Sequence, residues 1–249
     1  MRLAEFFQKY PELALAFSGG VDSAYLLYAA RKCGADVHAY YVKSAFQPRF
    51  ELEDAKRLAS QLGAAMTVID VDILSCADVT ANPPDRCYHC KQTIFQAIMK
   101  QAAEDGYDML IDGTNASDDA GDRPGMQALR ELAVRSPLRE CGLSKEEIRQ
   151  RSKEVGLFTW DKPAYACLAT RIPAGETITK EKLERTEQAE DFLFSLGFTD
   201  FRVRSIGDAA SLQILSSQIG KLIIYRRSIV HELKKYYSSV MLDMEVRDE

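Results

Sequence analysis

The chain has 249 residues and a mass of 27.9 kDa, with 46% hydrophobic, 28% charged and 9% aromatic residues. This composition excludes a disordered or collagen-like chain, and at about 150 residues per domain the length predicts one main domain with a smaller one. The formal charge of −5 and the pI near 5.4 argue against a protein that holds long nucleic acid through its phosphates.

Short apolar segments alternate with helical patterns in the first half of the chain. Strands are expected over residues 13–17, 37–42, 67–71 and 109–112, and helices over 21–32, 51–62 and 90–105. This alternation predicts right-handed βαβ units in an open parallel sheet. Such sheets bind ligands at the carboxyl ends of their strands, so we expect the following segments to lie together: residues 18–23, Lys43-Ser44 and Gly113-Thr114-Asn115.

The remaining elements are less regular. Residues 112–143 are rich in Gly, Asp, Ser and Pro and are expected to form a functional or mobile loop. Ser144 and Glu147 have capping-box spacing, which predicts a helix to about residue 155. Residues 160–175 are expected to be a linker that carries functional side chains.

The C-terminal pattern predicts a small α+β domain. Its expected elements are helices over 180–196 and near 228–236, with strands over 201–205, 211–215 and 240–244. We therefore expect an α/β domain over residues 1–165 and a small α+β domain over 166–249.

The turn after the first strand, Ser18-Gly19-Gly20-Val21-Asp22-Ser23, has the character of a phosphate site. Helix N-terminal N–H groups favour an anion, glycines permit close approach, and the serines offer hydroxyl donors. Asp22 would repel a phosphate unless a divalent cation lies between them. The segment lacks the signatures of P-loop and dinucleotide-binding proteins, and an ordinary helix-capping turn is the alternative.

This hexapeptide resembles that of the PP-loop ATP pyrophosphatases, a Rossmann-like α/β family that includes GMP, NAD and asparagine synthetases and tRNA-thiolating enzymes. The resemblance implies that ATP and Mg²⁺ bind here, with Asp22 on the metal and Ser44 and Gly113 near the nucleotide. It also implies that AMP is passed to a substrate oxygen while pyrophosphate leaves. A nucleophile then displaces AMP.

Three of the six cysteines are candidate ligands or nucleophiles. Cys87 and Cys90 have a spacing that suits one metal centre, a redox pair or half of a zinc site, and coincidence is the alternative. Cys167 lies in the expected linker, where sites often form, or is a small buried hydrophobe. The other three lack partners at ligand spacing and are expected to be buried or inert: Cys33, Cys76 and Cys141.

Over nearly its whole length, the chain resembles the LarE group of ATP-dependent sulfur transferases. The resemblance is carried by the N-terminal turn and four further segments: Asp112-Gly113-Thr114-Asn115, Asp122-Arg123-Pro124-Gly125, residues 167–173 and Arg202-Val203-Arg204. It implies synthesis of the nickel-pincer nucleotide cofactor of lactate racemase. Carboxylates of a pyridinium mononucleotide are adenylated and then converted to thiocarboxylates.

The cysteines bear on the sulfur source that this resemblance implies. Some LarE members sacrifice the sulfur of one cysteine, matching Cys167, whereas others bind a [4Fe–4S] cluster through three, matching Cys87, Cys90 and Cys167. Because this chain has all three, we expect a cluster whose open iron holds sulfide from a separate donor. Zinc is the alternative metal, with His89 as a fourth ligand.

Four basic side chains are candidate substrate contacts. Arg202 and Arg204 share one face of an expected strand, a spacing that suits one phosphate or a solvated sheet face. The LarE resemblance favours the phosphate. Arg171 either neutralises charge at the adenylated centre or is a surface cation, and Lys162 has the same two alternatives.

Two further positions are interpreted through the resemblance to the family alone. Glu190 matches a family glutamate near the site, and an exposed helix carboxylate is its alternative. Gln213 stands where the family segment often has an acidic residue, which weakens the case for a metal or proton-transfer role there.

We therefore predict a LarE-type sulfur transferase acting on a small nucleotide. No run approaches 18 apolar residues, and the N-terminus carries an acidic residue where a signal peptide would be apolar, so a cytoplasmic protein without a membrane partner is expected. The family resemblance implies a homo-oligomer, a hexamer built from C-terminal contacts. The alternative functions are an amide-forming ligase, a tRNA-thiolating enzyme and a non-catalytic nucleotide sensor.

Overall fold

The computed structural model describes residues 2–118 and 124–245, which form two compact units. Unit 1 comprises Met1–Ile73 and Asp85–Lys162, and unit 2 comprises Leu74–Pro84 and Pro163–Glu249. The units thus divide after Lys162, where the sequence placed the boundary after residue 165, and unit 2 takes a segment from the first half of the chain. Asn82 ties that segment to unit 2, because its side-chain amide donates to the carbonyl oxygens of Ile172 and Pro173.

Unit 1 contains a four-stranded parallel sheet in the order β3-β2-β1-β4. The strands are β1 (Glu12–Ala16), β2 (Asp36–Lys43), β3 (Met66–Asp70) and β4 (Leu110–Ile111). Leu15 of β1 pairs with Ala39 of β2 on one side and with Ile111 of β4 on the other. The predicted parallel α/β sheet is therefore confirmed.

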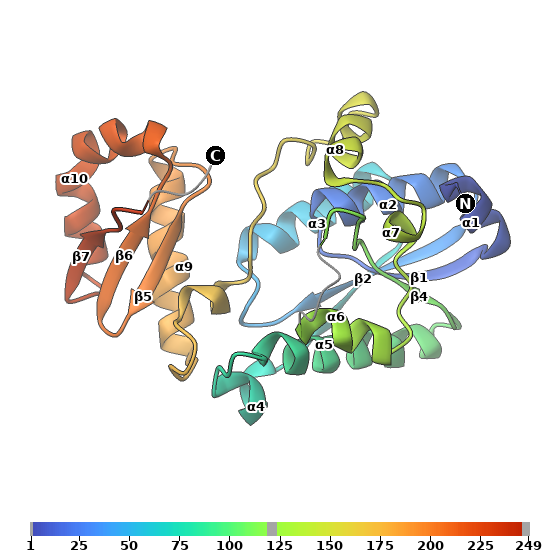
Figure 1. Ribbon diagram of the computed structural model, residues 1–249, viewed down its shortest axis with the longest axis horizontal. Coiled ribbons are helices and arrows are strands. Elements are labelled where there is room, and N and C mark those ends of the chain that lie inside the picture. The colour runs from blue at the N-terminus through green and yellow to red at the C-terminus, as the bar shows by residue number, and fades with distance from the viewer. Residues whose placement is uncertain (1, 119–123, 246–249) are drawn as a thin grey trace. The chain divides into compact units, whose positions relative to one another are not determined.

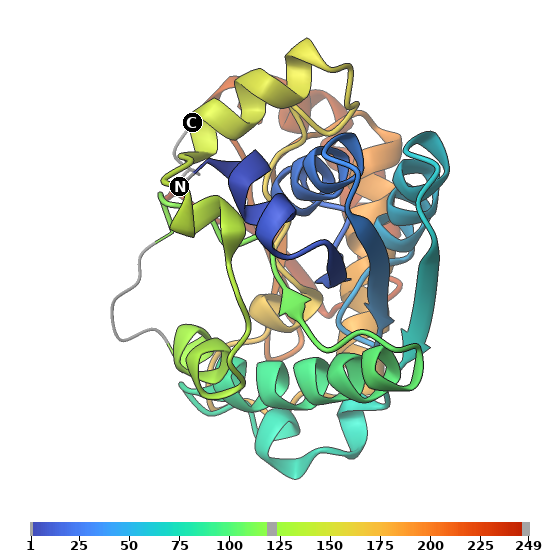
Figure 2. The same ribbon diagram turned by 90° about the vertical axis from the view of Figure 1, so that its right-hand side faces the viewer.

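Helices cover both faces of this sheet, which explains why β1 lacks polar alternation. Leu13 and Leu15 pack in one core with side chains of α1 (Leu3–Lys9), α2 (Val21–Lys32), α3 (Arg49–Gln61) and α8 (Lys145–Glu154). Ala14 points to the opposite face, in a core with α5 (Arg86–Glu104) and α6 (Pro124–Glu131). Figures 1 and 2 show α5 on the side of the strands opposite to α2 and α8.

Three features of unit 1 differ from the sequence-based expectation. Helix α1 was not predicted, although its Phe6 and Phe7 are buried in the core. The expected loop over 112–143 contains α6 and a short helix, α7 (Pro137–Glu140). Helix α5 begins at Arg86, four residues before the expected start. None of residues 86–89 is buried, so an apolar pattern does not mark this first turn.

Unit 2 is built on a mixed three-stranded sheet in the order β5-β6-β7, as the predicted small α+β domain requires. Its strands are β5 (Arg202–Ile206), β6 (Ala209–Gln213) and β7 (Ser239–Leu242), and its longer helices are α9 (Lys180–Ser195) and α10 (Ile219–Leu233). Short pieces complete the unit: η1 (Ile73–Ser75, shared with unit 1), α4 (Ala77–Thr80), η2 (Leu168–Arg171) and η3 (Ser216–Gln218).

The predicted start of the last helix was wrong. Helix α10 begins at Ile219 rather than near residue 228. The sequence pattern missed this start because the first turns of the helix expose Ile223 and Ile224 and so lack an amphipathic pattern. No helix in residues 2–118 and 124–245 is long and apolar enough to cross a membrane.

Candidate functional site

The turn between β1 and α2 places hydroxyl and amide groups around one helix end. Ser18 Oγ lies 3.1 Å from Ser23 Oγ, and Ser23 Oγ donates to the carbonyl oxygen of Gly20 at 3.2 Å. Gly20 is the N-cap of α2 and supplies no side-chain cap. The first N–H groups of a helix have no intrahelical acceptor, so this end of α2 offers donors to an anion.

Two glycines let other backbone segments approach the turn. Gly19 has φ of +73°, and a Cβ there would lie 3.1 Å from the Cβ of Ala55 in α3. Gly113 follows β4, and a Cβ there would lie only 2.9 Å from the backbone nitrogen of Ser23. Larger residues would therefore push α3 or the segment after β4 away from the start of α2.

The segment after β4 contacts Asp22 directly. The buried Asp112 carboxylate accepts hydrogen bonds from the Thr114 backbone N–H at 3.2 Å and from Ser136 Oγ at 2.6 Å, which holds the segment in place. Asn115, 1% exposed, then donates from Nδ2 to Asp22 Oδ1 at 3.2 Å. The structure thus brings the 18–23 turn and residues 113–115 together as the topology predicts.

A lysine that the sequence analysis missed completes this cluster. Lys145, the first residue of α8, forms an ion pair from Nζ to Asp22 Oδ2 at 2.5 Å. The two side chains are 35% and 21% exposed, so both reach solvent. Only the packing of α8 against α2 brings together residues 123 positions apart, and no local motif indicates it.

Ser44 lies at the carboxyl end of β2, adjacent in the sheet to β1. Its hydroxyl donates to Gln47 Oε1 at 2.7 Å, and its backbone N–H donates to the same oxygen at 3.1 Å. These bonds shape the turn into α3. Contact between Ser44 and a nucleotide stays a prediction.

The donor set at the turn fits Mg²⁺, which binds through one or two carboxylates together with phosphate oxygens and waters. Asp22 supplies such a carboxylate, partly exposed at the helix end that would hold the phosphates. Across residues 2–118 and 124–245, no group of three or more His, Cys, Asp or Glu side chains is arranged to hold a metal by itself.

Cys87 and Cys90 lie in the first turns of α5, one exposed and the other half-buried. A spacing of three places both thiols on one helix face. Arg86 Nη2 lies 3.7 Å from Cys87 Sγ, and His89 Nε2 lies 3.4 Å from an Asp85 carboxylate oxygen. The two thiols fit as a pair of metal ligands, and Cys167 belongs to unit 2.

The other three cysteines and Lys162 remain to be placed in the structure. Cys33 is exposed, so of the two expectations, buried or inert, only inertness stays as a prediction for it. Cys141 is half-buried, and burial raises the pKa of its thiol. Cys76 is also half-buried. Lys162 forms an ion pair with Asp54 within unit 1.

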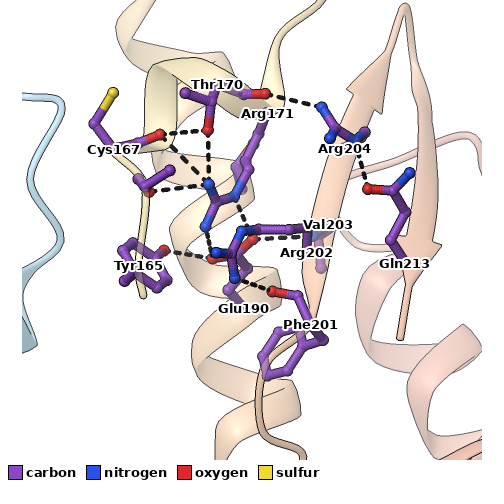
Figure 3. Close-up of polar contacts among 12 residues, drawn as sticks. Tyr165, Cys167, Thr170, Arg171, Glu190, Phe201, Arg202, Val203, Arg204 and Gln213 are labelled. Carbon is purple, nitrogen blue, oxygen red and sulfur yellow. Dashed lines mark hydrogen bonds and ion pairs between the residues drawn. The ribbon is translucent and has the colours of Figure 1, made fainter. Parts of the chain in front are cut away.

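A buried ion pair supports the segment that carries Cys167 (Figure 3). Arg171 and Glu190 are each 1% exposed, and the carboxylate accepts from Arg171 Nε at 2.8 Å and from Nη2 at 3.1 Å. Glu190 also accepts from the Tyr165 hydroxyl and from the Val203 backbone N–H. Burial acts to lower the pKa of Arg171, but Glu190 outweighs it and the pKa is raised, so the guanidinium stays charged.

The remaining donors of Arg171 hold the chain around the thiol. Arg171 Nη1 donates to the carbonyl oxygen of Ala166 at 2.9 Å and to Thr170 Oγ1 at 2.8 Å, and Thr170 Oγ1 donates to the Cys167 carbonyl oxygen at 2.8 Å. The half-buried Cys167 is therefore positioned from its backbone. The alternative expectations, a surface cation at Arg171 and an exposed carboxylate at Glu190, were wrong.

The two strand arginines hold the same segment. Arg202, 7% exposed, donates from Nη2 to the Ala164 carbonyl oxygen at 2.7 Å, and Arg204 donates from Nη1 to the Thr170 carbonyl oxygen at 3.1 Å. Arg204 Nε also donates to Gln213, whose amide donates to Asp243 at 2.7 Å. Asp243, which the sequence analysis missed, thus places a carboxylate beside the position of Gln213. Contact with a substrate phosphate stays a prediction for both arginines.

In unit 1, the first strand of a parallel sheet turns through glycines into a helix end that offers donors to an anion, beside a carboxylate. This combination defines a nucleotide-binding α/β protein. Residues 13–83 match the sequence model of the family described as queuosine biosynthesis protein QueC. Residues Asp122 and Arg123 of the LarE-like segment lie outside the described residues.

Similarity to curated relatives over more of the chain extends this assignment. An uncharacterised protein of Synechocystis sp. is 39% identical over 222 residues, covering 89% of this chain and 83% of that protein. The pyridinium-3,5-bisthiocarboxylic acid mononucleotide synthase of Lactiplantibacillus plantarum is 32% identical over 235 residues, covering 93% and 85%. A tRNA-specific 2-thiouridylase MnmA of Clostridium botulinum is 27% identical over 182 residues, covering 60% and 52%. The chain belongs to the PP-loop ATP pyrophosphatase superfamily, whose members are enzymes, and this membership implies the use of ATP.

Proposed function

We propose that this protein is a LarE-type sulfur transferase that makes a thiocarboxylate on a pyridinium mononucleotide for nickel-pincer cofactor synthesis. The observation that carries the proposal is the similarity to the Lactiplantibacillus plantarum synthase over 93% of the chain. It extends through both structural units, whereas the match to the tRNA thiouridylase covers 60%.

The first half-reaction is assigned to the turn of unit 1. A substrate carboxylate oxygen attacks the α-phosphorus of ATP, the bond to the β-phosphate oxygen breaks, and pyrophosphate leaves. The N–H groups at the start of α2 bind the departing phosphates, and Asp22 would hold Mg²⁺, which neutralises their charge when bound. The product is an acyl adenylate, whose AMP is a better leaving group than oxide.

The second half-reaction is assigned to the cysteines. A sulfur nucleophile attacks the acyl carbon, AMP leaves with the bonding electrons, and a thiocarboxylate remains. Cys87, Cys90 and Cys167 are the proposed ligands of a [4Fe–4S] cluster, which would hold the sulfide, with zinc or direct loss of the Cys167 sulfur as the alternatives. Within unit 2, Arg171 and Glu190 position the Cys167 backbone.

The proposal includes the surroundings in which the enzyme works. Its small-molecule partners are the mononucleotide substrate and a sulfide donor, and it acts as a cytoplasmic homo-oligomer without long nucleic acid. Arg202 and Arg204 are the proposed contacts for the substrate phosphate, which would replace part of their present hydrogen bonds to backbone carbonyl oxygens.

A tRNA-thiolating enzyme is the second candidate, because the similarity to the tRNA thiouridylase includes more than half of the chain. The acidic balance of the sequence argues against tRNA as the substrate, since binding would require neutralised phosphates. An amide-forming ligase would need no thiol ligands, and a nucleotide sensor would release no pyrophosphate.

The test begins with protein purified without oxygen. Iron, acid-labile sulfide and zinc are measured, and pyrophosphate release is followed with the pyridinium biscarboxylic acid mononucleotide or with tRNA. We expect release with the mononucleotide only, its loss in Asp22→Asn, and thiocarboxylate formation that stops in Cys167→Ala while pyrophosphate release continues. Pyrophosphate release with tRNA but not with the mononucleotide would reject the proposal. No release with either substrate would also reject it.

A further inference from the structure

A chain of hydrogen bonds runs through unit 2 from Arg204 to the end of the last strand. Arg204 Nε donates to Gln213 Oε1 at 2.7 Å (Figure 3), and Gln213 Nε2 donates to Asp243 Oδ2 at 2.7 Å. A guanidinium can only donate and an ionised carboxylate can only accept, so the amide of Gln213 bridges them in one orientation. If the amide turned by 180°, its NH₂ would face the guanidinium and its oxygen would face the carboxylate.

The sheet places these three side chains next to one another. Arg202 of β5 is paired with Gln213 of β6, so Arg204, two residues further along β5, lies diagonally opposite Gln213 on the same face. Asp243 directly follows β7, and its backbone N–H donates to the Leu212 carbonyl oxygen at 2.9 Å. The backbone of the sheet therefore sets the spacing of the three groups.

Asp243 is suited to its place at the end of this chain. The hydrogen bond from Gln213 and a second one from the Glu245 backbone N–H, at 3.0 Å to Oδ1, hold the pKa of the Asp243 carboxyl below its usual value. The charge of Arg204 acts in the same direction. Asp243 is therefore ionised at neutral pH and only accepts, which keeps the oxygen of Gln213 aimed at Arg204.

Arg204 retains a donor edge near the segment of Cys167. Its Nη1 donates to the Thr170 carbonyl oxygen at 3.1 Å, and Thr170 Oγ1 donates to the Cys167 carbonyl oxygen at 2.8 Å. Within residues 2–118 and 124–245, no acceptor contacts Arg204 Nη2, and the side chain is half-buried. Because Nε and Nη1 are both held, the plane of the guanidinium and the direction of Nη2 are fixed.

We propose that Asp243 is a positioning residue that acts through Gln213 to aim Arg204 at the phosphate of the substrate nucleotide. The inference rests on the proposed function, in which Arg204 contacts that phosphate. Since the amide of Gln213 is neutral, it orients Arg204 without neutralising the charge that attracts the phosphate. It also separates the Asp243 carboxylate from the phosphate, so that the two anions are not in contact.

The experiment measures binding of the pyridinium biscarboxylic acid mononucleotide, and of its phosphate-free nucleoside, to the full-length protein by isothermal titration calorimetry. Asp243→Asn should weaken binding of the mononucleotide by about 3- to 10-fold, because the Gln213 amide is then free to turn. A direct electrostatic role would give the opposite sign, since removing a carboxylate lessens the repulsion of a phosphate. Asp243→Glu should recover part of the loss. The control Asp208→Asn removes an exposed carboxylate from the turn between β5 and β6, and should match the wild type.

A second pair of variants tests whether Asp243 acts through Gln213. In the Gln213→Ala protein the link is absent, so adding Asp243→Asn should weaken mononucleotide binding no further. The affinity for the nucleoside should change less than twofold in every variant, because the nucleoside lacks the phosphate that Arg204 would contact.

Four results would overturn the inference: unchanged or tighter mononucleotide binding by Asp243→Asn, the same loss in the Gln213→Ala background, an equal loss for the nucleoside, or no mononucleotide binding by the wild type. Thiocarboxylate formation separates this inference from the proposed function. The expected pattern of binding without any thiocarboxylate product would reject the sulfur transfer alone. Product formation with wild-type binding by Asp243→Asn would reject the role of Asp243 alone.

Discussion

The buried ion pair beneath Cys167 supports a prediction about both stability and thiol reactivity. The substitution is Glu190→Gln, which keeps the size of the side chain and removes its charge. In the wild type, this carboxylate accepts two hydrogen bonds from Arg171 and one each from Tyr165 and Val203. An amide has one acceptor oxygen and one NH₂ group, so at least one of these donors would face another donor.

The expected loss is large because both partners are withdrawn from water. Their side chains are only 1% and 2% exposed, so solvent does not screen the charge of Arg171 once Glu190 is neutral. Breaking a buried pair at one partner costs about 3–5 kcal/mol in the free energy of unfolding. The control Glu184→Gln removes a carboxylate from the same helix, where the pair with Lys180 is exposed, and should cost less than about 1 kcal/mol.

Two measurements check this prediction. Urea denaturation followed by far-UV circular dichroism gives the unfolding free energy, and mass spectrometry of the peptide containing Cys167 gives its rate of alkylation. We expect faster alkylation in Glu190→Gln, because Arg171 can no longer hold the Ala166 carbonyl oxygen in the same geometry. After Arg171→Met, the same change at Glu190 should cost about 1–3 kcal/mol less than in the wild type.

A cost below about 1 kcal/mol for Glu190→Gln, similar to that of the exposed control, would refute the argument from burial. An unchanged alkylation rate despite a large loss of stability would show that the pair supports the fold of unit 2 without positioning Cys167.

Four further substitutions test other parts of the structure. Gly113→Ala should cost about 1–3 kcal/mol and weaken nucleotide binding, because its Cβ would lie 2.9 Å from a backbone nitrogen of α2. Gly220→Ala, a helix position with no neighbour within 4 Å, should instead stabilise by about 0.5–1 kcal/mol, and thermal denaturation distinguishes the signs. Asn82→Ala should cost about 2–4 kcal/mol in urea denaturation, since φ is +55° and the amide serves three carbonyl oxygens; a change near zero would contradict this. For Glu140, hydrogen bonds from Arg135 hold the carboxyl pKa below its usual value, so the pair stabilises above about pH 4.5 and the benefit is lost as pH falls through the folded-state pKa. Glu140→Gln should therefore lower the free energy of unfolding by up to about 1 kcal/mol at pH 7 and leave it unchanged in acid. An equal loss at both pH values would show that the ion pair with Arg135 is not its cause.

Local patterns were sufficient for most of the fold. Strand β1 is a short apolar run because both of its faces are covered, and α8 starts where Ser144 and Glu147 cap it. The apolar patterns failed to predict helices in which buried and exposed residues do not follow the helical repeat. Helix α10 presents Ile223 and Ile224 to solvent, and the short helix α1 buries two adjacent phenylalanines, so neither shows a regular apolar stripe.

The sequence by itself determined the α/β class, the glycine-containing turn after the first strand and the likeness to ATP pyrophosphatases, because each depends on residues that are neighbours in the chain. Tertiary structure alone decided which charges meet. Lys145 reaches Asp22 across 123 positions, and Arg171, for which a surface cation was one of two alternatives, is buried against Glu190. Charged side chains carry no local signal of their partners, since a partner is set by the packing of helices and strands that are distant in sequence.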